Sequence, residues 1–178
     1  MPDLASHRWG HPASRAPRRL QPWLTERGSL TARLRAHFPA VRVRLLRQGP
    51  GQPLRDELAP LGQPRPCRSV VREILLLSGD TPLVFAHSVM TYQSLRYGFG
   101  LLRHQGVKPL GATLFANPRV QRSPLAWRRL DRRHPLWRAA AAAVAGLPPQ
   151  LWARRSRFTL GHAELLITEV FLPAILKE

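Results

Sequence analysis

Residues 69–77 constrain the fold more than any other part of this chain. Their β-branched and aliphatic side chains lie between a proline and the turn at residues 78–80, a pattern typical of a strand. The turn leads into a second apolar run at residues 83–90, so the two runs are predicted to pair as a hairpin. The first run also carries two adjacent charges, Arg72 and Glu73, among apolar residues that indicate a strand covered on both faces.

The two charges of this strand must point in opposite directions, because successive side chains of a strand alternate between its faces. An unpaired buried charge is very costly, so each of them needs a partner or a ligand. The alternation alone leaves open which of the two, Arg72 or Glu73, faces a ligand.

A second strand near the C-terminus, residues 165–172, carries one carboxylate, Glu169, among apolar residues. Two interpretations of Arg72 and Glu169 remain open. In the first, they form a structural salt bridge between neighbouring strands, joined by Glu73 or Arg155. In the second, both face one pocket, where Arg72 binds a carboxylate of a small anionic molecule by a two-pronged hydrogen bond. Glu169 would then have a raised pKa and transfer a proton or hold a hydroxyl group.

The chain of 178 residues is long enough for one domain with a buried core. Its net charge of +18 is compatible with binding of nucleic acid, of a membrane surface or of a small anionic substrate. All but two of the 28 basic residues are arginines, and they are scattered along the chain instead of clustering in one arm. We therefore favour a solvated positive surface and expect no nucleic-acid partner. Two interpretations of Arg154, Arg155 and Arg157 stay open: they add positive charge to the site beside the last strand, or they lie on a solvated hairpin edge.

Several kinds of site lack their sequence signatures. The chain has no GxGxxG or GxxxxGK[ST] phosphate loop, no HExxH pattern and no GxSxG motif. We therefore expect no metal and no cofactor, and we interpret His87 as a hydrogen-bonded core histidine. Cys67 is the only cysteine, which suits a reducing compartment, so we expect a cytoplasmic location. No apolar run reaches the roughly 18–20 residues of a membrane span.

The rest of the chain is predicted to add helices and strands to the hairpin. Ser29 is a suitable N-cap for a helix that carries Leu30, Leu34 and Phe38 on one side. The other expected elements are strands at residues 41–47, 112–115, 151–160 and 164–172, and helices at residues 92–103, from Ser123 onward, and at residues 135–145. Strands linked by hairpins, with helices at both ends of the chain, favour an α+β fold with an antiparallel sheet.

The N-terminal residues differ from the remainder of the chain. Residues 1–20 are basic, contain several prolines and lack hydrophobic periodicity. We expect them to form a disordered extension ahead of one domain over residues 21–178. Their deletion is expected to leave the function of the domain nearly intact.

Several stretches taken together resemble the chorismate pyruvate-lyase family, whose members make 4-hydroxybenzoate for ubiquinone biosynthesis. They occur in the family's order and at near-family spacing over roughly residues 23–173. The stretches are Val71-Arg72-Glu73-Ile74-Leu75-Leu76, Pro109-Leu110-Gly111 with Leu114-Phe115, Leu151-Trp152-Ala153-Arg154-Arg155-Ser156, and Leu165-Leu166-Ile167-Thr168-Glu169-Val170-Phe171-Leu172-Pro173.

The resemblance implies a chorismate lyase-like fold, a single antiparallel six-stranded sheet with covering helices that enclose a product site. It also implies a cofactor-free lyase that converts chorismate into 4-hydroxybenzoate and pyruvate. Arg72 matches the family arginine that binds the ring carboxylate, and Glu169 matches the carboxylate near the 4-hydroxyl group. Leu110 matches a site residue that contributes a backbone contact, and Leu30 lies where the family has an apolar residue on a covering flap. Glu73 would then point away from the site, toward an arginine.

The chain departs from the family pattern in two segments, and a second function remains open. The segment at residues 117–150 is longer than the family pattern, and the N-terminal extension is longer and more basic. The alternative is a small-molecule-sensing effector domain of the same fold class, without catalysis, but residues 1–68 lack the helix-turn-helix module that normally precedes such domains. For the lyase, we expect chorismate, a dianion attracted by a positive site, as the substrate, and a monomer as the functional unit.

Overall fold

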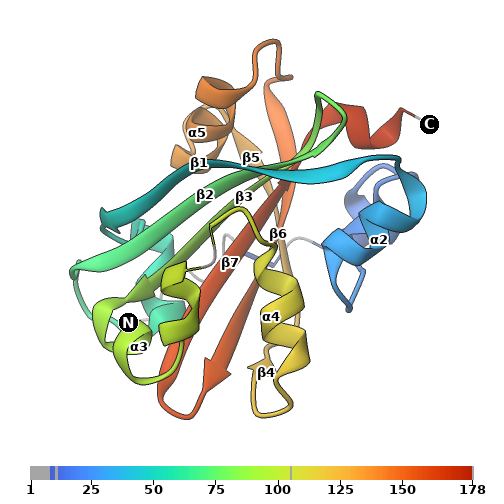
Figure 1. Cartoon of the computed structure of the whole chain (residues 1–178). Coiled ribbons are helices and arrows are strands. Elements are labelled where there is room, and N and C mark those ends of the chain that lie inside the picture. Colours follow the sequence, from blue (N-terminus) through green and yellow to red (C-terminus); the bar gives the residue numbers. More distant parts are fainter. Residues whose placement is uncertain (1–8, 11, 105, 178) are drawn as a thin grey trace.

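The computed structural model describes residues 9–10, 12–104 and 106–177, and within them it contains one antiparallel sheet of seven strands with helices on both faces (Figure 1). The strands are β1 (Val41–Gly51), β2 (Ser69–Ser78), β3 (Thr81–Thr91), β4 (Gln121–Arg122), β5 (Ala126–Asp131), β6 (Gln150–Leu160) and β7 (Ala163–Phe171). The α-helices are α1 (Gln21–Leu24), α2 (Leu30–His37), α3 (Tyr92–Tyr97), α4 (Leu110–Ala116) and α5 (Pro135–Ala143). Short 3-10 helices occupy Ala13–Arg15, Arg55–Glu57, Ala59–Leu61, Gly100–His104 and Pro173–Leu176.

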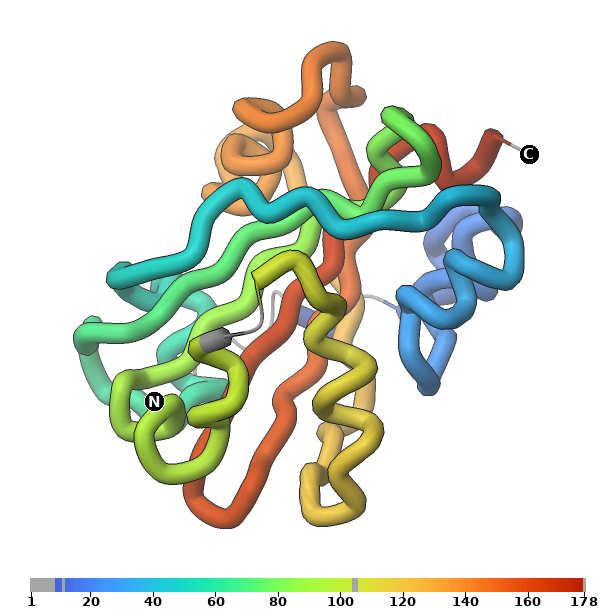
Figure 2. Tube along the Cα trace, in the orientation of Figure 1, coloured from blue at the N-terminus to red at the C-terminus, as the bar shows by residue number. Residues whose placement is uncertain are grey.

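The sheet brings the two ends of the sequence together. Its strands run in the order β1-β2-β3-β7-β6, so the C-terminal strand β7 lies between β3 and β6, as the red tube beside the green one in Figure 2 shows. At the outer edge of β6, β4 pairs with residues 158–159 and β5 with residues 150–155. The expected α+β fold with a single antiparallel sheet is confirmed. The sheet has seven strands and not six because β4 and β5 share the last position.

The two predicted hairpins form as expected. β2 pairs with β3 through the turn at Gly79, and β6 pairs with β7 through the turn at Gly161. Both glycines have positive φ, 55° and 60°, which other residues rarely adopt. The four strands of these hairpins have neighbours on both sides, which explains their nearly continuous apolar sequences. β1 forms an edge, and its residues are half-buried or exposed.

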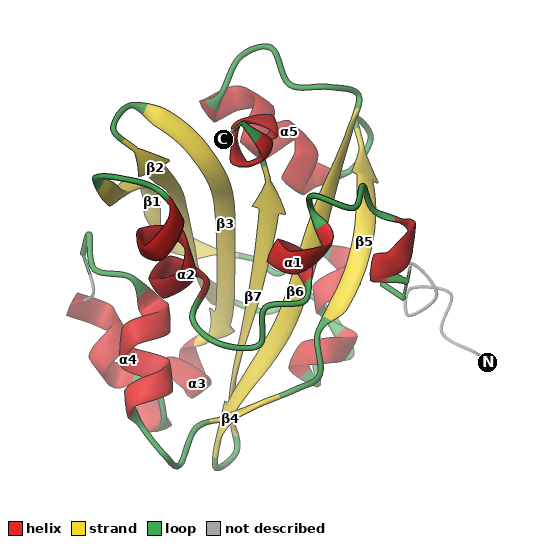
Figure 3. Ribbon diagram, turned by 90° about the vertical axis from the view of Figure 1, so that its right-hand side faces the viewer, coloured by secondary structure: helices red, strands yellow, loops and turns green. Residues whose placement is uncertain are grey.

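Each face of the sheet has its own apolar core. Leu34 of α2 is buried in one cluster with Ile74 of β2, and Leu136 of α5 is buried in another with Phe85 of β3. Ile74 and Phe85 point to opposite faces, so α2 and α5 cover opposite sides of the sheet. Figure 3 shows α4 on the same side as α2. The face covered by α2 and α4 is called the inner face below.

Three of the four predicted helices form, with shorter lengths. Ser29 caps α2, because its hydroxyl accepts a hydrogen bond from the Ala32 N–H (3.3 Å). Helix α5 ends at Ala143, and Gly146 follows with a positive φ of 72°. Helix α3 ends at Tyr97, where a segment with two glycines begins, and a 3-10 helix replaces the rest of the predicted helix.

Two elements contradict the sequence prediction. Residues 112–115, predicted as a strand, belong to helix α4, which buries Leu110 and Leu114 at helical spacing; the apolar run was too short to distinguish the two periods. The residues from Ser123 onward, predicted to begin a helix, instead lead into strand β5. The Ser123 N–H donates to the Arg157 carbonyl (2.8 Å) and its hydroxyl accepts from the Arg157 N–H (3.0 Å), which holds this segment against β6.

The N-terminal segment packs on the domain in its described part, so the prediction of disorder is wrong there. Ala16 and Leu20 are buried in the cluster that contains α2. The Trp9 indole N–H donates to the Asp56 carboxylate at 2.6 Å. Residues 1–8 and 11 lie outside the described residues. The boundary expected at residue 21 therefore cuts through packed residues.

The outer face of the sheet, which α5 covers, also carries a row of polar side chains at paired positions of five strands. These residues are Arg155, Thr168, His87, Glu73 and Arg47. His87 lies between two carboxylates: its Nδ1 is 3.0 Å from Glu73 Oε1, and its Nε2 is 3.4 Å from Glu57 Oε1. His87 is thus a hydrogen-bonded core histidine, as predicted. Glu73 faces an arginine on this side of the sheet, as expected, because Arg47 is its paired neighbour on β1; the hydrogen bond from His87 and the charge of Arg47 lower the pKa of Glu73.

The charges around His87 stabilise its protonated form. Burial alone would lower the pKa of His87, but the negative charges of Glu57 and Glu73 raise it to about 9. Glu57 is fully buried; burial alone would raise its pKa, but the positive charge of His87 lowers the pKa below the usual value. Arg155 lies 3.4 Å from Glu57 and is buried, which rules out the solvated hairpin edge that was one interpretation of its position.

The raised pKa of His87 makes stability depend on pH. A group whose pKa is higher in the folded state stabilises the fold fully below its unfolded pKa of 6.5 and loses this contribution as the pH rises through about 9. We expect the free energy of unfolding to fall by about 3 kcal/mol between pH 6 and pH 9.5, measured by urea denaturation. A His87→Gln variant is the control, and the same decline in that variant would assign the effect to other groups.

Candidate active site

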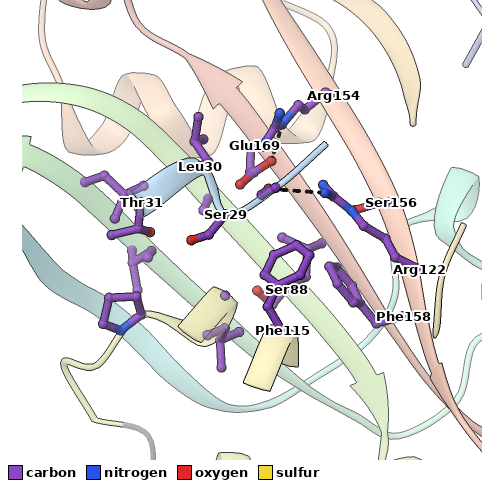
Figure 4. Close-up of a pocket in the computed structure, with 18 of the residues that line it drawn as sticks. Ser29, Leu30, Thr31, Ser88, Phe115, Arg122, Arg154, Ser156, Phe158 and Glu169 are labelled. Carbon is purple, nitrogen blue, oxygen red and sulfur yellow. Dashed lines mark hydrogen bonds and ion pairs between the residues drawn. The ribbon is translucent and has the colours of Figure 1, made fainter. Parts of the chain in front are cut away.

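A cavity lies on the inner face, between the sheet and the beginnings of α2 and α4 (Figure 4). Its floor consists of side chains from β2, β3, β7 and β6, and β4 closes one side. Its interior volume is about 50 Å³. This is room for a few water molecules, so a ring-sized ligand enters only when the covering residues move. All four site residues expected from the sequence, Leu30, Arg72, Leu110 and Glu169, line this one cavity.

Arg72 brings an unbalanced positive charge into the cavity. It lies in the middle of β2, is 4% exposed, and belongs to none of the ion pairs in the described part of the chain. Its Nη2 donates to the carbonyls of Gly106 (2.9 Å) and Lys108 (3.1 Å), whereas its buried Nε has no acceptor among the described residues. Burial lowers the pKa of Arg72 to about 10, so it remains charged at neutral pH. The site therefore favours an anion beside Arg72.

Glu169 is held by an arginine that the sequence interpretation did not select. Arg154, directly opposite Glu169 on β6, donates from Nε to Glu169 Oε2 at 2.5 Å. Its Nη1 also donates to the carbonyls of Trp23 (3.0 Å) and Glu26 (2.7 Å), which ties the cavity to the segment before α2. Arg154 is 0% exposed and lines the cavity, so it adds positive charge to the site and does not lie on a solvated hairpin edge, the other interpretation of the sequence.

Arg72 and Glu169 do not form the structural salt bridge that was one of the two interpretations. β3 lies between their strands, and Arg72 pairs with Ser88 whereas Glu169 pairs with Ala86. The two side chains therefore stand in adjacent rows of the inner face and both reach the cavity. This geometry leaves space between a cation and a carboxylate, as the pocket interpretation requires.

The beginnings of two helices cover the cavity. Leu30 and Leu110 are the first residues of α2 and α4, and both are buried. The helices approach closely, because a Cβ atom on Gly111 would lie 3.2 Å from the Ser29 hydroxyl. The first N–H groups of a helix have no acceptor within the helix, so the first turn of α4 offers donors at this end of the cavity.

Arg122 on β4 is a third arginine of the cavity. Its Nε donates to the Ser156 hydroxyl (3.0 Å) and its Nη1 to the Arg27 carbonyl (2.7 Å). Its guanidinium lies over the rings of Phe115 and Phe158, 5.5 and 5.3 Å from their centres. Figure 4 shows Arg122 on the same side of the cavity as Arg154.

The sequence contained a signal for one of the two missed arginines. Once the β6–β7 turn is placed at Gly161, antiparallel pairing puts Arg154 opposite Glu169 and Arg155 opposite Thr168. Arg122 had no comparable signal, because β4 has only two residues and lies in a segment that was predicted to lead into a helix.

The described residues contain no group of three or more histidine, cysteine or acidic side chains that could hold a metal ion. No helix in the described part of the chain is both long and apolar enough to cross a membrane. The chemistry of the cavity thus consists of arginines, one carboxylate, hydroxyl groups and apolar side chains.

The α+β fold is one that other solved proteins share. The effector domain of PhnF from Mycobacterium smegmatis has a TM-score of 0.54 at 14% identity and covers 82% of this chain and 89% of its own. The C-terminal domain of the histidine utilization repressor from Pseudomonas syringae has a TM-score of 0.50 at 13% identity and covers 75% of this chain and 92% of its own. Identities this low establish the fold alone.

The sequence comparisons then identify the family. The family model described as chorismate lyase matches residues 6–178. A protein from Azoarcus sp. named probable chorismate pyruvate-lyase is 48% identical over 93% of this chain and 89% of its own length. A protein of the same name from Thiobacillus denitrificans is 45% identical over 94% and 90%. The chain belongs to the chorismate lyase family.

Proposed function

We propose that this protein is a chorismate pyruvate-lyase, which converts chorismate into 4-hydroxybenzoate and pyruvate on the way to ubiquinone. The observation that carries the proposal is the buried, unpaired Arg72 in a cavity that also holds Glu169. Membership in the chorismate lyase family, with relatives 42–48% identical, supports catalysis over a purely ligand-sensing role.

The reaction breaks the ether bond between the ring and the enolpyruvyl group and removes one proton from the ring. The ether bond at ring carbon 3 breaks, and its electron pair leaves with the oxygen of the enolpyruvyl group. The proton on carbon 4 departs, its electron pair completes the aromatic ring, and the released enolate takes up a proton at its CH2 carbon to give pyruvate. Aromatisation supplies driving force, so the protein contributes mainly positioning and stabilisation of charge.

Each site residue has a role in this proposal. Arg72 binds the ring carboxylate through its free Nε and the adjacent Nη group. Glu169, oriented by Arg154, accepts the hydrogen bond of the 4-hydroxyl group and assists movement of the proton from carbon 4. The backbone of Leu110 contributes a contact to the carboxylate end of the ligand, and Leu30 covers the ring.

The proposed reaction is tested by incubating the protein with chorismate, without added metal or cofactor. We expect equal molar amounts of 4-hydroxybenzoate, followed by its absorbance, and of pyruvate, followed by a coupled dehydrogenase. Absence of both products, together with tight binding of 4-hydroxybenzoate, would support the effector-domain alternative that the shared fold suggests.

Leu30 is expected to act as a moving cover, because the cavity is too small for the ring when Leu30 is in its buried position. A Leu30→Ala variant should release 4-hydroxybenzoate about tenfold faster, since truncation removes packing from the bound ligand. Stopped-flow fluorescence measures the release rate, and Leu34→Ala, which shortens a buried leucine one turn further along α2, is the control for general loosening of the helix. Equal release rates in both variants would contradict the covering role of Leu30.

The proposal also covers the location, the oligomeric state and the partners of the protein. We propose a cytoplasmic monomer that binds chorismate and no nucleic acid. Light scattering at micromolar concentration should give the mass of one chain, and a mobility shift with duplex DNA should be absent at physiological salt, where nonspecific electrostatic binding is weak.

A further inference from the structure

The cavity holds more positive charge than the described chain balances. Among the residues that the structure describes, three arginines line it, and Glu169 is the only acidic residue of the lining. Glu169 forms an ion pair with Arg154, so one of the three charges is neutralised. Arg72 and Arg122 take part in no ion pair among the described residues. Two uncompensated cations in one small cavity are costly unless the ligand brings two negative charges.

The hydrogen bonds of Arg122 fix its side chain and leave one edge open. Nε donates to Ser156, and Nη1 donates to the carbonyls of Arg27 (2.7 Å) and Gly28 (3.4 Å). No acceptor among the described residues takes the hydrogens of Nη2. The rings of Phe115 and Phe158 support the guanidinium plane. A guanidinium held in this way is preorganised to bind a carboxylate with little loss of side-chain entropy.

The positions of the two unpaired arginines suit a ligand with two separated anionic groups. Arg72, Ser88, Ile167 and Ser156 are paired in sequence across β2, β3, β7 and β6, and Arg122 is hydrogen-bonded to Ser156 at the end of this row. Three strand spacings of about 4.8 Å separate the two ends of the row, so the backbones lie about 14 Å apart. Two arginine side chains that reach inward from these ends leave a gap that a substituted ring can fill.

We infer that Arg122 binds the second carboxylate of the substrate, the one carried by the enolpyruvyl group, while Arg72 binds the ring carboxylate. This inference rests on the proposed function, because 4-hydroxybenzoate lacks the second carboxylate and chorismate has it. Arg154 does not serve as the second anchor, because Glu169 already balances its charge. Burial lowers the pKa of Arg122, and the negative charges of Glu169 and Glu26 offset only part of this effect.

Arg122 would then distinguish substrate from product. Both bind Arg72, but only the substrate and the departing enolpyruvate contact Arg122. As the ether bond breaks, negative charge develops on the enolate, and the cation beside its carboxylate stabilises that charge. After the bond is broken, pyruvate can leave by this side of the cavity, independently of the aromatic product.

Two aromatic ligands measure how much the second carboxylate contributes to binding. The first is 3-(carboxymethoxy)-4-hydroxybenzoate, which carries both anionic groups, and the second is its amide, 3-(carbamoylmethoxy)-4-hydroxybenzoate, which has nearly the same shape and one charge fewer. Calorimetry with the full chain should show that the dianion binds at least tenfold more tightly than the amide. In Arg122→Gln this preference should disappear, whereas Arg122→Lys should retain part of it because the charge is kept.

Kinetics provide the second readout. Arg122→Gln should lower kcat/KM for chorismate about 100-fold, with most of the change in KM, and should change the Kd of 4-hydroxybenzoate less than threefold. Arg119→Gln, which removes an exposed arginine three residues away, is the matched control for net charge and should resemble the parent. Thermal unfolding of each variant shows whether the fold is retained.

Two outcomes overturn the inference. One is an unchanged preference for the dianion in Arg122→Gln; the other is equal weakening of the dianion, the amide and 4-hydroxybenzoate, which would make Arg122 a structural residue only. Both are distinct from failure of the proposed function, which appears as a parent protein that forms no 4-hydroxybenzoate from chorismate.

Discussion

Replacing Arg72 with glutamine is expected to weaken 4-hydroxybenzoate binding and to lower kcat/KM for chorismate by about 100- to 1,000-fold. The buried Nε of Arg72 has no acceptor in the described chain, and its charge has no counter-ion there. The carboxylate of the ligand would accept the hydrogen bond from Nε and neutralise the charge. A charge-assisted contact of this kind in a dry site corresponds to about 3–4 kcal/mol. Calorimetry with 4-hydroxybenzoate and steady-state kinetics with chorismate measure the two effects.

The same substitution is expected to leave the ligand-free protein at least as stable as the parent. Arg72 is a buried charge whose pKa burial lowers to about 10, and its removal relieves a desolvation cost. The thermal midpoint should therefore stay equal or rise, while the stabilisation by added 4-hydroxybenzoate disappears. Arg65→Gln, which removes an exposed arginine ahead of β2, is the control. Retention of tight 4-hydroxybenzoate binding in Arg72→Gln would contradict the carboxylate-binding role.

Glu169→Gln is the second substitution with a large expected effect. Glutamine keeps the shape and can still accept the hydrogen bond from Arg154 Nε, but it is a far weaker base. We expect kcat to fall more than 100-fold while the Kd of 4-hydroxybenzoate rises about tenfold or less, because the hydroxyl group retains an acceptor. Activity within about tenfold of the parent would remove proton transfer from the role of Glu169.

Glu169→Gln is also expected to lower the stability of the ligand-free protein, whereas Arg72→Gln is not. The loss of the carboxylate leaves Arg154, which is 0% exposed, as a buried charge without a counter-ion. Breaking a buried ion pair costs about 3–5 kcal/mol, so the thermal midpoint should fall. The double variant Glu169→Gln with Arg154→Gln should recover part of this stability without recovering activity, which separates the structural from the chemical contribution.

Local sequence patterns were enough to predict the two hairpins at the centre of the sheet. The apolar runs of β2, β3, β6 and β7, with glycine turns at Gly79 and Gly161, predicted two hairpins that the structure confirms. The position of β7 between β3 and β6 is a long-range pairing that no turn signals, and the sequence analysis did not predict this strand order. It is this pairing that brings Glu169 into the same cavity as Arg72.

The edges of the cavity were harder to predict, for physical reasons. Residues 112–115 have a pattern that fits both a strand and a helix, and only packing of Leu110 and Leu114 decides for the helix. The position of Arg122 depends on hydrogen bonds between Ser123 and β6, which are tertiary contacts. The pairing register of the β6–β7 hairpin would have predicted Arg154 opposite Glu169. Arg154 is not solvated, because Glu169 and two backbone carbonyls accept its hydrogen bonds.

A crystal structure of this protein with bound 4-hydroxybenzoate tests the central claim most directly. The account expects the ring in the cavity of the inner face, its carboxylate within hydrogen-bonding distance of Arg72 and its hydroxyl group beside Glu169, with Leu30 over the ring. A product molecule bound outside this cavity, or bound inside it with the carboxylate toward Glu169 and the hydroxyl toward Arg72, would contradict the account.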